Sequence, residues 1–234
     1  LDEAGLPDDV LQVVVGSGAA IGTPLARDDR VKMVTFTGSP AVGKQLASDA
    51  GMKHITLELG SNSATIVDDD ADLELAADRV LLGGFSYSGQ ICISVQRVIV
   101  NHKVYDQFLQ MLIDRVGKLK YGEPLDETTD VSALITRNEG ERVKSWIQEA
   151  VDAGAKVAVG GVGEDGGLLP TILTDVTRDM KVMCREIFGP VVSVLKVRDL
   201  CEGIEVANDS DYGLQAGVFT NDLNKALYAA RRLE

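Results

Sequence analysis

Residues 31–43 read Val-Lys-Met-Val-Thr-Phe-Thr-Gly-Ser-Pro-Ala-Val-Gly. The β-branched and aromatic residues at the start of this stretch predict a strand. Gly38 permits a turn, Ser39 is a typical N-cap residue, and Pro40 suits the first turn of a helix expected over Ala41–Ala50. A strand that passes through a short turn into a helix is the building unit of α/β proteins.

The rest of the chain repeats this alternation of short apolar runs and amphipathic stretches, which favours an α/β fold with mostly parallel sheets flanked by helices. We expect strands at Leu11–Val15, Val31–Phe36, His54–Leu57, Ala64–Val67, Arg97–Asn101, Val157–Val159, Val191–Val197 and Gly217–Thr220. We expect helices at Ala41–Ala50, Leu73–Phe85, Tyr105–Leu119, Glu139–Ala153, Cys201–Asn208 and Leu223–Leu233. Loops are expected over Tyr121–Asp130 and the glycine-rich Gly160–Gly167.

The composition of the 234 residues is that of a globular protein, and it disfavours several classes of partner. A net charge of −13 without a local basic cluster would repel a phosphate backbone, so we expect no nucleic-acid partner. No run of about 18 apolar residues predicts a membrane span. The three cysteines are widely spaced and form no CxxC pair, so we expect no metal site and a reduced, cytoplasmic protein.

Two strand-to-helix junctions could bind a phosphate. At Gly38-Ser39 the free N–H groups of the following helix would face a ligand, although the GxGxxG fingerprint is absent. Gly16-Ser17-Gly18-Ala19 offers a second such junction. A junction without any ligand explains either pattern equally well.

Three further stretches contain groups that could do chemistry. Glu58, in Leu57-Glu58-Leu59-Gly60, stands at the end of an apolar strand, where α/β proteins build their sites, although an exposed edge carboxylate is the commoner explanation. Cys92, in Ser88-Gly89-Gln90-Ile91-Cys92, could be a nucleophile or a small buried apolar residue. No histidine lies near it in sequence, which disfavours a Cys/His hydrolase.

The third stretch is Glu186-Ile187-Phe188-Gly189-Pro190. A carboxylate can accept both hydroxyls of a ribose, and an aromatic ring can pack on a planar ligand. A structural turn is the alternative.

The order of these motifs, namely FTGS, LELG, GQIC and EIFGP, resembles the aldehyde dehydrogenase family over essentially the whole chain. The separation of Glu58 and Cys92 also matches that family. The resemblance implies that Cys92 attacks the aldehyde, that its backbone N–H stabilises the resulting oxyanion, and that Glu58 activates the water that hydrolyses the thioester. The activity implied is oxidation of a small aldehyde to a carboxylic acid, with NAD or NADP as hydride acceptor.

The resemblance also assigns cofactor contacts. It places Gly38 and Ser39 against the pyrophosphate and the nicotinamide side, Leu59 and Gly60 along the nicotinamide pocket, Glu186 on the nicotinamide ribose and Phe188 beside the nicotinamide ring. Cys184 and Cys201 match no nucleophile of the family, so we expect them to serve packing. The run Gln90–Arg97 resembles branches that act on small hydroxylated or phosphorylated aldehydes such as lactaldehyde.

The resemblance implies a Rossmann-like part of the NAD(P)-binding domain over residues 1–60 and the thiol-bearing catalytic domain over residues 61–234. It further implies a longer parent enzyme that is a homo-oligomer, with an asparagine oxyanion donor upstream and further strands downstream, so that the piece alone would be inactive. Ser61 stands where the family usually has a second glycine. Two alternatives are a CoA-acylating relative, which needs no hydrolytic base, and a non-catalytic binding or structural relative.

Overall fold

The computed structural model describes residues 2–7 and 9–234, and the chain divides into two compact units, Leu1–Gly60 and Ser61–Glu234. The first unit contains η1 (Asp2–Ala4), α1 (Gly18–Arg27), β1 (Met33–Thr37), α2 (Pro40–Ala50) and β2 (His54–Glu58). The second contains β3 (Ala64–Val67), α3 (Leu73–Phe85), η2 (Ser86–Gly89), β4 (Arg97–Asn101), α4 (Tyr105–Val116), α5 (Arg137–Asp152), β5 (Lys156–Val162), β6 (Leu168–Thr174), α6 (Lys181–Cys184), β7 (Val191–Val197), α7 (Leu200–Asn208), β8 (Ala216–Phe219) and α8 (Leu223–Arg232).

The first unit is built on the strand–turn–helix predicted around Gly38. Strands β1 and β2 pair in parallel, and α2 connects them. The Ser39 hydroxyl accepts a hydrogen bond from the Val42 N–H at 3.4 Å, and Pro40 is the first helical residue of α2. The ammonium group of Lys53 donates to the Asp28 carbonyl at 2.8 Å and so ties the start of β2 to the end of α1.

The strand expected over Leu11–Val15 is wrong, because the structure has irregular chain there. Val13 is 82% and Val15 is 92% exposed, and none of the described strands pairs with this segment. β-Branched residues favour a strand only when a neighbouring backbone and a packing face are present. The junction that follows does start a helix, since the Ser17 hydroxyl caps α1 by accepting from the Ala20 N–H at 3.3 Å.

The second unit contains a six-stranded sheet in the order β5-β6-β7-β4-β3-β8. All neighbours are parallel except β5 and β6. In the centre, Ile66 of β3 is level with Ile99 of β4, which is level with Leu195 of β7. Every residue of β3 and β4 is buried, as expected for parallel strands that are covered on both faces.

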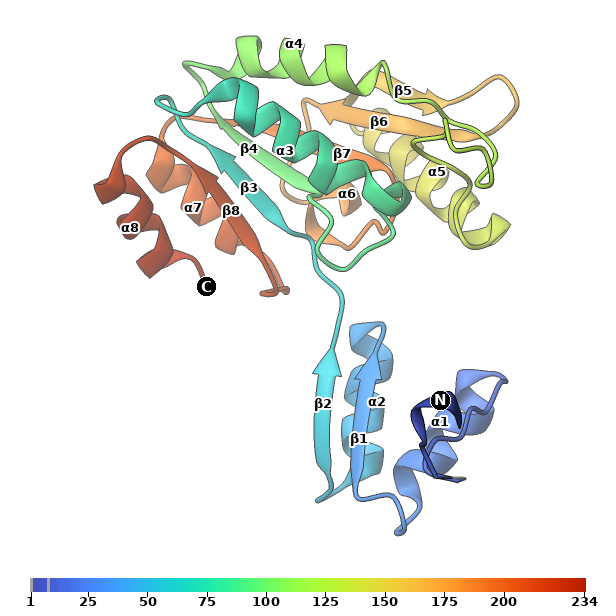
Figure 1. The fold of residues 1–234 in the computed structure, drawn as a ribbon. Helices are drawn as coiled ribbons and strands as arrows, with labels where there is room; N and C mark the ends of the chain where they lie inside the picture. The colour runs from blue at the N-terminus through green and yellow to red at the C-terminus, as the bar shows by residue number, and fades with distance from the viewer. Residues whose placement is uncertain (1, 8) are drawn as a thin grey trace. The chain divides into compact units, whose positions relative to one another are not determined.

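Helices cover both faces of this sheet (Figure 1). Val98 and Val100 point to one face and pack with Phe108 and Leu112 of α4 and with residues of α3. Ile99 points to the other face, where α7 and α8 supply the apolar partners. The alternation of side chains along β4 therefore builds one core on each side. None of the described helices is long and apolar enough to cross a membrane.

The loop expected over Gly160–Gly167 is wrong in its first part. Gly160 and Gly161 lie inside β5, which forms an irregular antiparallel hairpin with β6. Gly160 has φ +83°, and a Cβ on it would lie 1.9 Å from the Pro170 carbonyl oxygen, so the two backbones meet where only glycine fits. The pattern of Leu168–Thr174 did not predict a strand because Pro170 interrupts it.

Candidate active site

In the first unit, the carboxyl ends of β1 and β2 bring together two stretches that the sequence singled out. Thr37 is level with Glu58, and the Gly38 N–H donates to the Glu58 carbonyl at 3.0 Å. The N-terminus of α2, capped by Ser39, follows at once. A helix N-terminus beside a glycine turn is suited to a phosphate group, because its first N–H groups have no partner within the helix.

Glu58 ends β2 with an exposed side chain. Its carboxylate forms neither a hydrogen bond nor an ion pair with another residue in the described part of the chain. The next residue, Leu59, packs its side chain against α2 at Gly43, where an added Cβ would lie 2.5 Å from Leu59 Cδ2. The backbone after Glu58 is therefore held against the helix while the carboxylate stays free to bind or to accept a proton.

Cys92 lies in the second unit, on a tight turn between η2 and β4. The Ser94 N–H closes this turn by donating to the Ile91 carbonyl at 2.9 Å. The Cys92 side chain is half-buried, and its backbone N–H donates to no acceptor among the residues described. A half-buried thiol beside an unused N–H group can attack a carbonyl carbon and stabilise the charge that forms on the carbonyl oxygen.

The residues before this turn have an unusual backbone. Tyr87 has φ +53° and Ser88 has φ +56°, and both belong to the left-handed region that non-glycine residues rarely adopt. Such strain persists only where the surrounding packing enforces it, and it is concentrated at functional sites.

Glu186 and Phe188 lie on a second turn, before β7. Glu186 is half-buried, and its Oε1 accepts a hydrogen bond from the Ser61 N–H at 2.9 Å. Burial raises the pKa of the Glu186 carboxyl, while the Ser61 N–H and the nearby charge of Arg142 oppose the rise. Phe188 has φ +48° and is 37% exposed, so its ring is available to a ligand. A carboxylate with one oxygen held and the other available, next to an exposed ring, fits a nucleoside.

The Cys92 turn and the Glu186 turn are packed backbone against backbone. Gly89 has φ +69°, and a Cβ on it would lie 2.1 Å from the carbonyl oxygen of Gly189 and 2.9 Å from the nitrogen of Pro190. Since no side chain separates the two glycines, the GQIC and EIFGP stretches form one packed element. The structure thus brings the turn of Cys92 and the turn of Glu186 into contact within the same unit.

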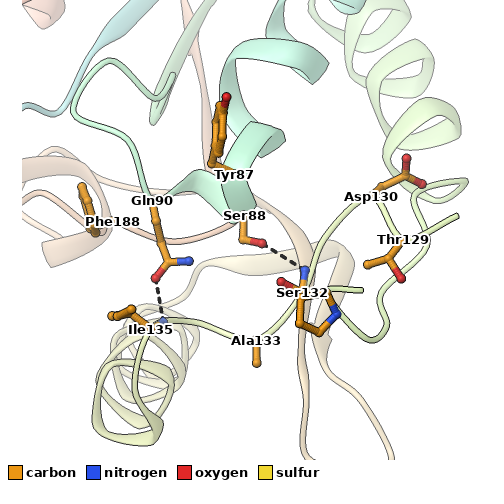
Figure 2. Close-up of a pocket in the computed structure, with 10 residues that line it drawn as sticks. Tyr87, Ser88, Gln90, Thr129, Asp130, Ser132, Ala133, Ile135 and Phe188 are labelled. Atoms are coloured by element: carbon orange, nitrogen blue, oxygen red, sulfur yellow. Dashed lines mark hydrogen bonds between the residues drawn. The ribbon is translucent and has the colours of Figure 1, made fainter. Parts of the chain in front are cut away.

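A cavity of about 560 Å³ adjoins this element (Figure 2). The Ser88 hydroxyl accepts from the Ser132 N–H at 3.0 Å, and the Gln90 side chain accepts from the Ile135 N–H at 2.8 Å. These bonds, drawn as dashed lines in Figure 2, attach the opposite wall of the cavity to the residues before Cys92. The cavity is lined by Tyr87, Ser88, Gln90, Pro124, Thr129, Asp130, Ser132, Ala133, Ile135 and Phe188.

Two buried polar side chains, Gln96 just before β4 and Arg97 at its first position, have structural roles that sequence reasoning missed. Gln96 is 4% and Arg97 is 3% exposed. Arg97 donates to the carbonyl oxygens of Val206 and Ala207 at 2.9 Å each, at the end of α7, and burial lowers the pKa of its guanidinium to about 10. The available signal was a pair of polar residues directly before the apolar run Val98–Val100. Polar groups next to a buried strand are themselves buried only when their hydrogen bonds are satisfied.

The two remaining cysteines lie elsewhere. Cys184 is half-buried, and its sulfur lies 3.5 Å from the Asp179 carbonyl oxygen. The packing role expected for Cys201 is wrong, because this residue is exposed, with its sulfur 3.7 Å from the Tyr228 hydroxyl.

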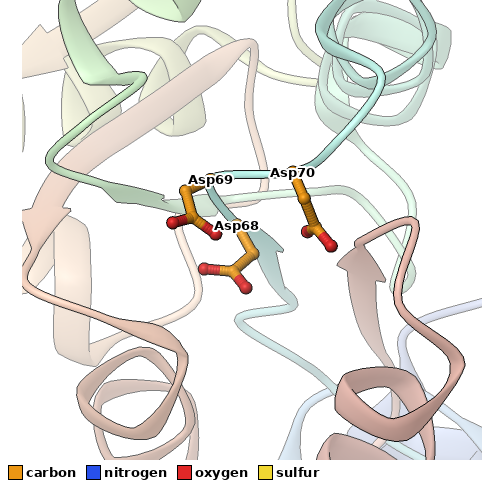
Figure 3. A group of neighbouring side chains, drawn as sticks. All are labelled: Asp68, Asp69 and Asp70. Carbon is orange, nitrogen blue, oxygen red and sulfur yellow. The ribbon is translucent and has the colours of Figure 1, made fainter.

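Three consecutive carboxylates at the end of β3, those of Asp68, Asp69 and Asp70, are close enough to share a cation (Figure 3). The ammonium group of Lys225 lies 2.7 Å from Asp68 Oδ2, 2.8 Å from Asp69 Oδ1 and 3.5 Å from Asp70 Oδ1. A side chain of α8 therefore supplies the positive charge that this cluster needs.

The family model named Aldehyde dehydrogenase family matches residues 1–234, and the chain belongs to this family. It is similar to 3-sulfolactaldehyde dehydrogenase of Priestia aryabhattai, with 50% identity over 100% of this chain and 49% of that protein. It is also similar to lactaldehyde dehydrogenase of Methanococcus aeolicus, with 41% identity over 98% of this chain and 49% of that protein. The chain thus spans about half the length of the curated relatives it matches.

Solved structures agree with the fold. Glyceraldehyde-3-phosphate dehydrogenase GapN from Methanocaldococcus jannaschii, complexed with NADP, matches with a TM-score of 0.95 at 38% identity, over 100% of this chain and 51% of that one. Betaine aldehyde dehydrogenase from Staphylococcus aureus, in complex with NAD+, matches with a TM-score of 0.93 at 36% identity, over 99% of this chain and 48% of that one. The α/β, aldehyde dehydrogenase-like fold predicted from the sequence is confirmed.

Proposed function

We propose that the full-length protein oxidises a small aldehyde to a carboxylic acid with NAD+ or NADP+, and that Cys92 is its nucleophile. The observation that carries this proposal is the packing of the Cys92 turn on the Glu186 turn, through Gly89 and Gly189. One of these two turns carries a half-buried thiol with an unused N–H group, and the other carries a half-buried carboxylate and an exposed ring. One element thus offers a group for attack and groups for holding a nucleoside.

In the first step, the sulfur of Cys92 forms a bond to the aldehyde carbon, and the carbonyl oxygen becomes an oxyanion. The backbone N–H of Cys92 donates a hydrogen bond to this oxygen. Fixed donors of this kind typically contribute a factor of about 10²–10³ in rate. The thiol proton leaves to solvent before attack, because the thiolate is the reactive form.

Each unit carries groups suited to one part of a dinucleotide. Glu186 Oε1 is held by Ser61, which leaves the second carboxylate oxygen to accept from ribose hydroxyls, and Phe188 borders the ring. Gly38 and Ser39, at the start of α2, receive the pyrophosphate, and the backbone of Leu59 and Gly60 lines the nicotinamide side. When bound, the nicotinamide supplies the acceptor for the hydride that leaves the substrate carbon. We assign residues 1–60 to the cofactor-binding domain and residues 61–234 to the catalytic domain on these grounds.

Loss of the hydride leaves a thioester on Cys92, and Glu58 then activates water for its hydrolysis. The free, exposed carboxylate at the end of β2 is suited to take the proton of that water. Hydrolysis releases the carboxylic acid and restores the thiol. A CoA-acylating enzyme needs no such base, so the presence of Glu58 favours the hydrolytic reaction.

The named relatives favour a short hydroxylated substrate. Both 3-sulfolactaldehyde and lactaldehyde, named in the two similar dehydrogenases, are aldehydes of three carbons that carry a hydroxyl group. We propose the same substrate class here, with either NAD or NADP, since the two similar structures hold one of each.

Replacement of Cys92 by serine in the full-length protein tests the nucleophile. We expect aldehyde oxidation to fall below about 1% of the wild-type rate, because an alcohol without an adjacent base is a poor nucleophile. Cys184→Ser and Cys201→Ser are matched controls that should retain nearly full activity. Turnover by Cys92→Ser at the control rate would refute the assignment.

Replacement of Glu58 by glutamine separates the two half-reactions. Rapid mixing with an aldehyde should show a first-turnover burst of NAD(P)H followed by slow turnover, because the thioester accumulates. Unchanged steady-state turnover would mean that another group activates the water. A rate that rises on addition of CoA, with a CoA thioester as product, would favour the acylating alternative.

A further inference from the structure

Gln96 lies between the Cys92 turn and β4, directly before the first residue of that strand. It lies four residues after Cys92, and its backbone already joins two other segments: its N–H donates to the Ser63 carbonyl at 3.1 Å, and its carbonyl accepts from the Ser193 N–H at 2.9 Å. Its side chain is 4% exposed and points away from solvent. A buried amide of this kind must find partners for its donors and its acceptor.

All of these partners lie in the segment that carries Glu186. The side-chain Nε2 donates to the carbonyl oxygens of Val182, at 3.2 Å, and of Arg185, and the side-chain Oε1 accepts from the Ile187 N–H at 2.8 Å. The residues on both sides of Glu186 are therefore held by one amide group. The direction in which the Glu186 side chain leaves the backbone follows from these bonds.

The carboxylate itself has a separate anchor. The Ser61 N–H holds Oε1 of Glu186, and the neighbouring Asn62 side chain donates to the Met183 carbonyl at 3.0 Å. The Arg142 guanidinium also donates to the Ile187 carbonyl at 2.8 Å, and the Tyr212 hydroxyl accepts from the Glu186 N–H at 3.4 Å. These contacts come from elsewhere in the fold, whereas the Gln96 side chain connects the backbone on both sides of Glu186 to the start of the strand that follows Cys92. Gly89 supplies a steric contact between the two turns but no hydrogen bond.

We propose that Gln96 is a positioning residue that sets Glu186 relative to Cys92 and so determines how tightly the cofactor ribose is held. The proposal rests on the function proposed above for Glu186. Gln96 touches neither substrate nor cofactor in this role. It acts by fixing the backbone at Arg185 and Ile187, so its loss should affect cofactor binding while the thiol remains reactive.

Two variants of the full-length protein test this role. Gln96→Glu keeps the acceptor for the Ile187 N–H but places a carboxylate oxygen against the carbonyls of Val182 and Arg185. Gln96→Met has nearly the same volume and removes all three bonds without adding a charge, so it remains informative if the first variant fails to fold. Gln110→Glu, on the exposed surface of α4, is the matched control for an added charge.

The measurements are the Kd of NAD+ and NADP+, the kcat at saturating cofactor, and the rate at which iodoacetamide alkylates Cys92 without cofactor, followed by peptide mass analysis. We expect the Kd to rise about tenfold or more in both Gln96 variants, equivalent to the loss of one to two hydrogen bonds. Both kcat and the alkylation rate should stay within about threefold of wild type, and Gln110→Glu should change none of the three.

Two results would overturn the proposal. If both variants fold and bind the cofactor as tightly as wild type, Gln96 does not position Glu186. If the Kd, kcat and alkylation rate all worsen together with the melting temperature, Gln96 is a general structural residue. A wild-type protein that binds neither cofactor would instead refute the proposed function, so failure of the two ideas can be told apart.

Discussion

Replacement of Gly89 by alanine would introduce a single methyl group at the contact between the Cys92 turn and the Glu186 turn. The new Cβ would lie 2.1 Å from the Gly189 carbonyl oxygen, 2.4 Å from its carbon and 2.9 Å from the Pro190 nitrogen. All three atoms belong to the backbone, so no side chain can rotate to make room. One turn must move away from the other by about 1 Å to restore ordinary contact.

The expected cost has two parts. Alanine at φ +69° costs about 1–2 kcal/mol relative to glycine, because its Cβ approaches the following carbonyl. Forcing the two backbones apart adds about 1–3 kcal/mol, as for other overpacked sites. A total of about 2–5 kcal/mol is a large part of the 5–15 kcal/mol by which a domain is stable. A shift of 1 Å at reacting groups can also lower the rate about 100-fold.

Gly166→Ala is the control, because Gly166 has a similar φ of +79° and nothing within 4 Å of an added Cβ. It should lose only the backbone part, about 1–2 kcal/mol. Chemical denaturation of both variants gives the difference, and alkylation of Cys92 reports the local shift. If Gly89→Ala is no less stable than Gly166→Ala and its Cys92 reacts normally, the two turns are not in the close contact that the argument requires.

Two further substitutions should change how stability depends on pH. Burial raises the folded-state pKa of Glu186, so the ionised carboxylate costs stability above that pKa and the cost vanishes below the unfolded value near 4.5. Glu186→Gln should therefore melt at a higher temperature than wild type at pH 8, with the difference shrinking toward pH 4; a constant difference would contradict this. Lys225→Met should lose about 1–3 kcal/mol at pH 7, because the buried carboxylate of Asp68 loses its charged partner. Hydrogen bonds from Lys103 and then Lys225 lower the pKa of Asp69 from 3.8 to about 2, so this stabilisation is fully present above 3.8 and is lost as pH falls from there through about 2. Urea titrations should show that the loss in free energy of unfolding caused by Lys225→Met is smaller at pH 2.5 than at pH 7. An equal loss at both pH values would refute the account.

The central elements could be predicted from sequence because local preference and tertiary environment agree there. The ranges predicted for β3, β4, β7 and α3 match the structure residue for residue. These strands are short β-branched runs buried on both faces, and α3 begins at an N-cap aspartate, Asp72. The errors occur where the local preference of the sequence and the tertiary environment disagree. Val13–Val15 prefer a strand but pair with none of the described strands. Pro170 interrupts the pattern of β6 and falls at an irregularity in the pairing of β5 with β6.

The candidate site likewise has residues that could be predicted from the sequence and residues that could not. Cys92, Glu58 and Glu186 stand in recognisable motifs, and their types suggest their chemistry directly. The supporting residues could not be assigned from sequence, because the roles of Gln96 and Arg97 depend on partners that are 91 and 109 residues away. A buried amide reveals only that partners must exist, and the fold decides which ones.

The hydrogen bonds that assemble the Glu186 turn join distant parts of the chain, and this has a consequence for biosynthesis. Ser61 and Glu186 are separated by 125 residues, and the hydroxyl of Ser210 reaches back 148 residues to the amide of Asn62. Contacts of such separation form late in folding, because the entropy cost of closing a long loop precedes the stabilisation that the contacts provide. A chain emerging from the ribosome therefore presents Cys92 long before its partner turn exists. The Glu186 turn can pack on the Cys92 turn only when most of the second unit has been translated, so partly synthesised chains contain Cys92 without the turn that packs against it.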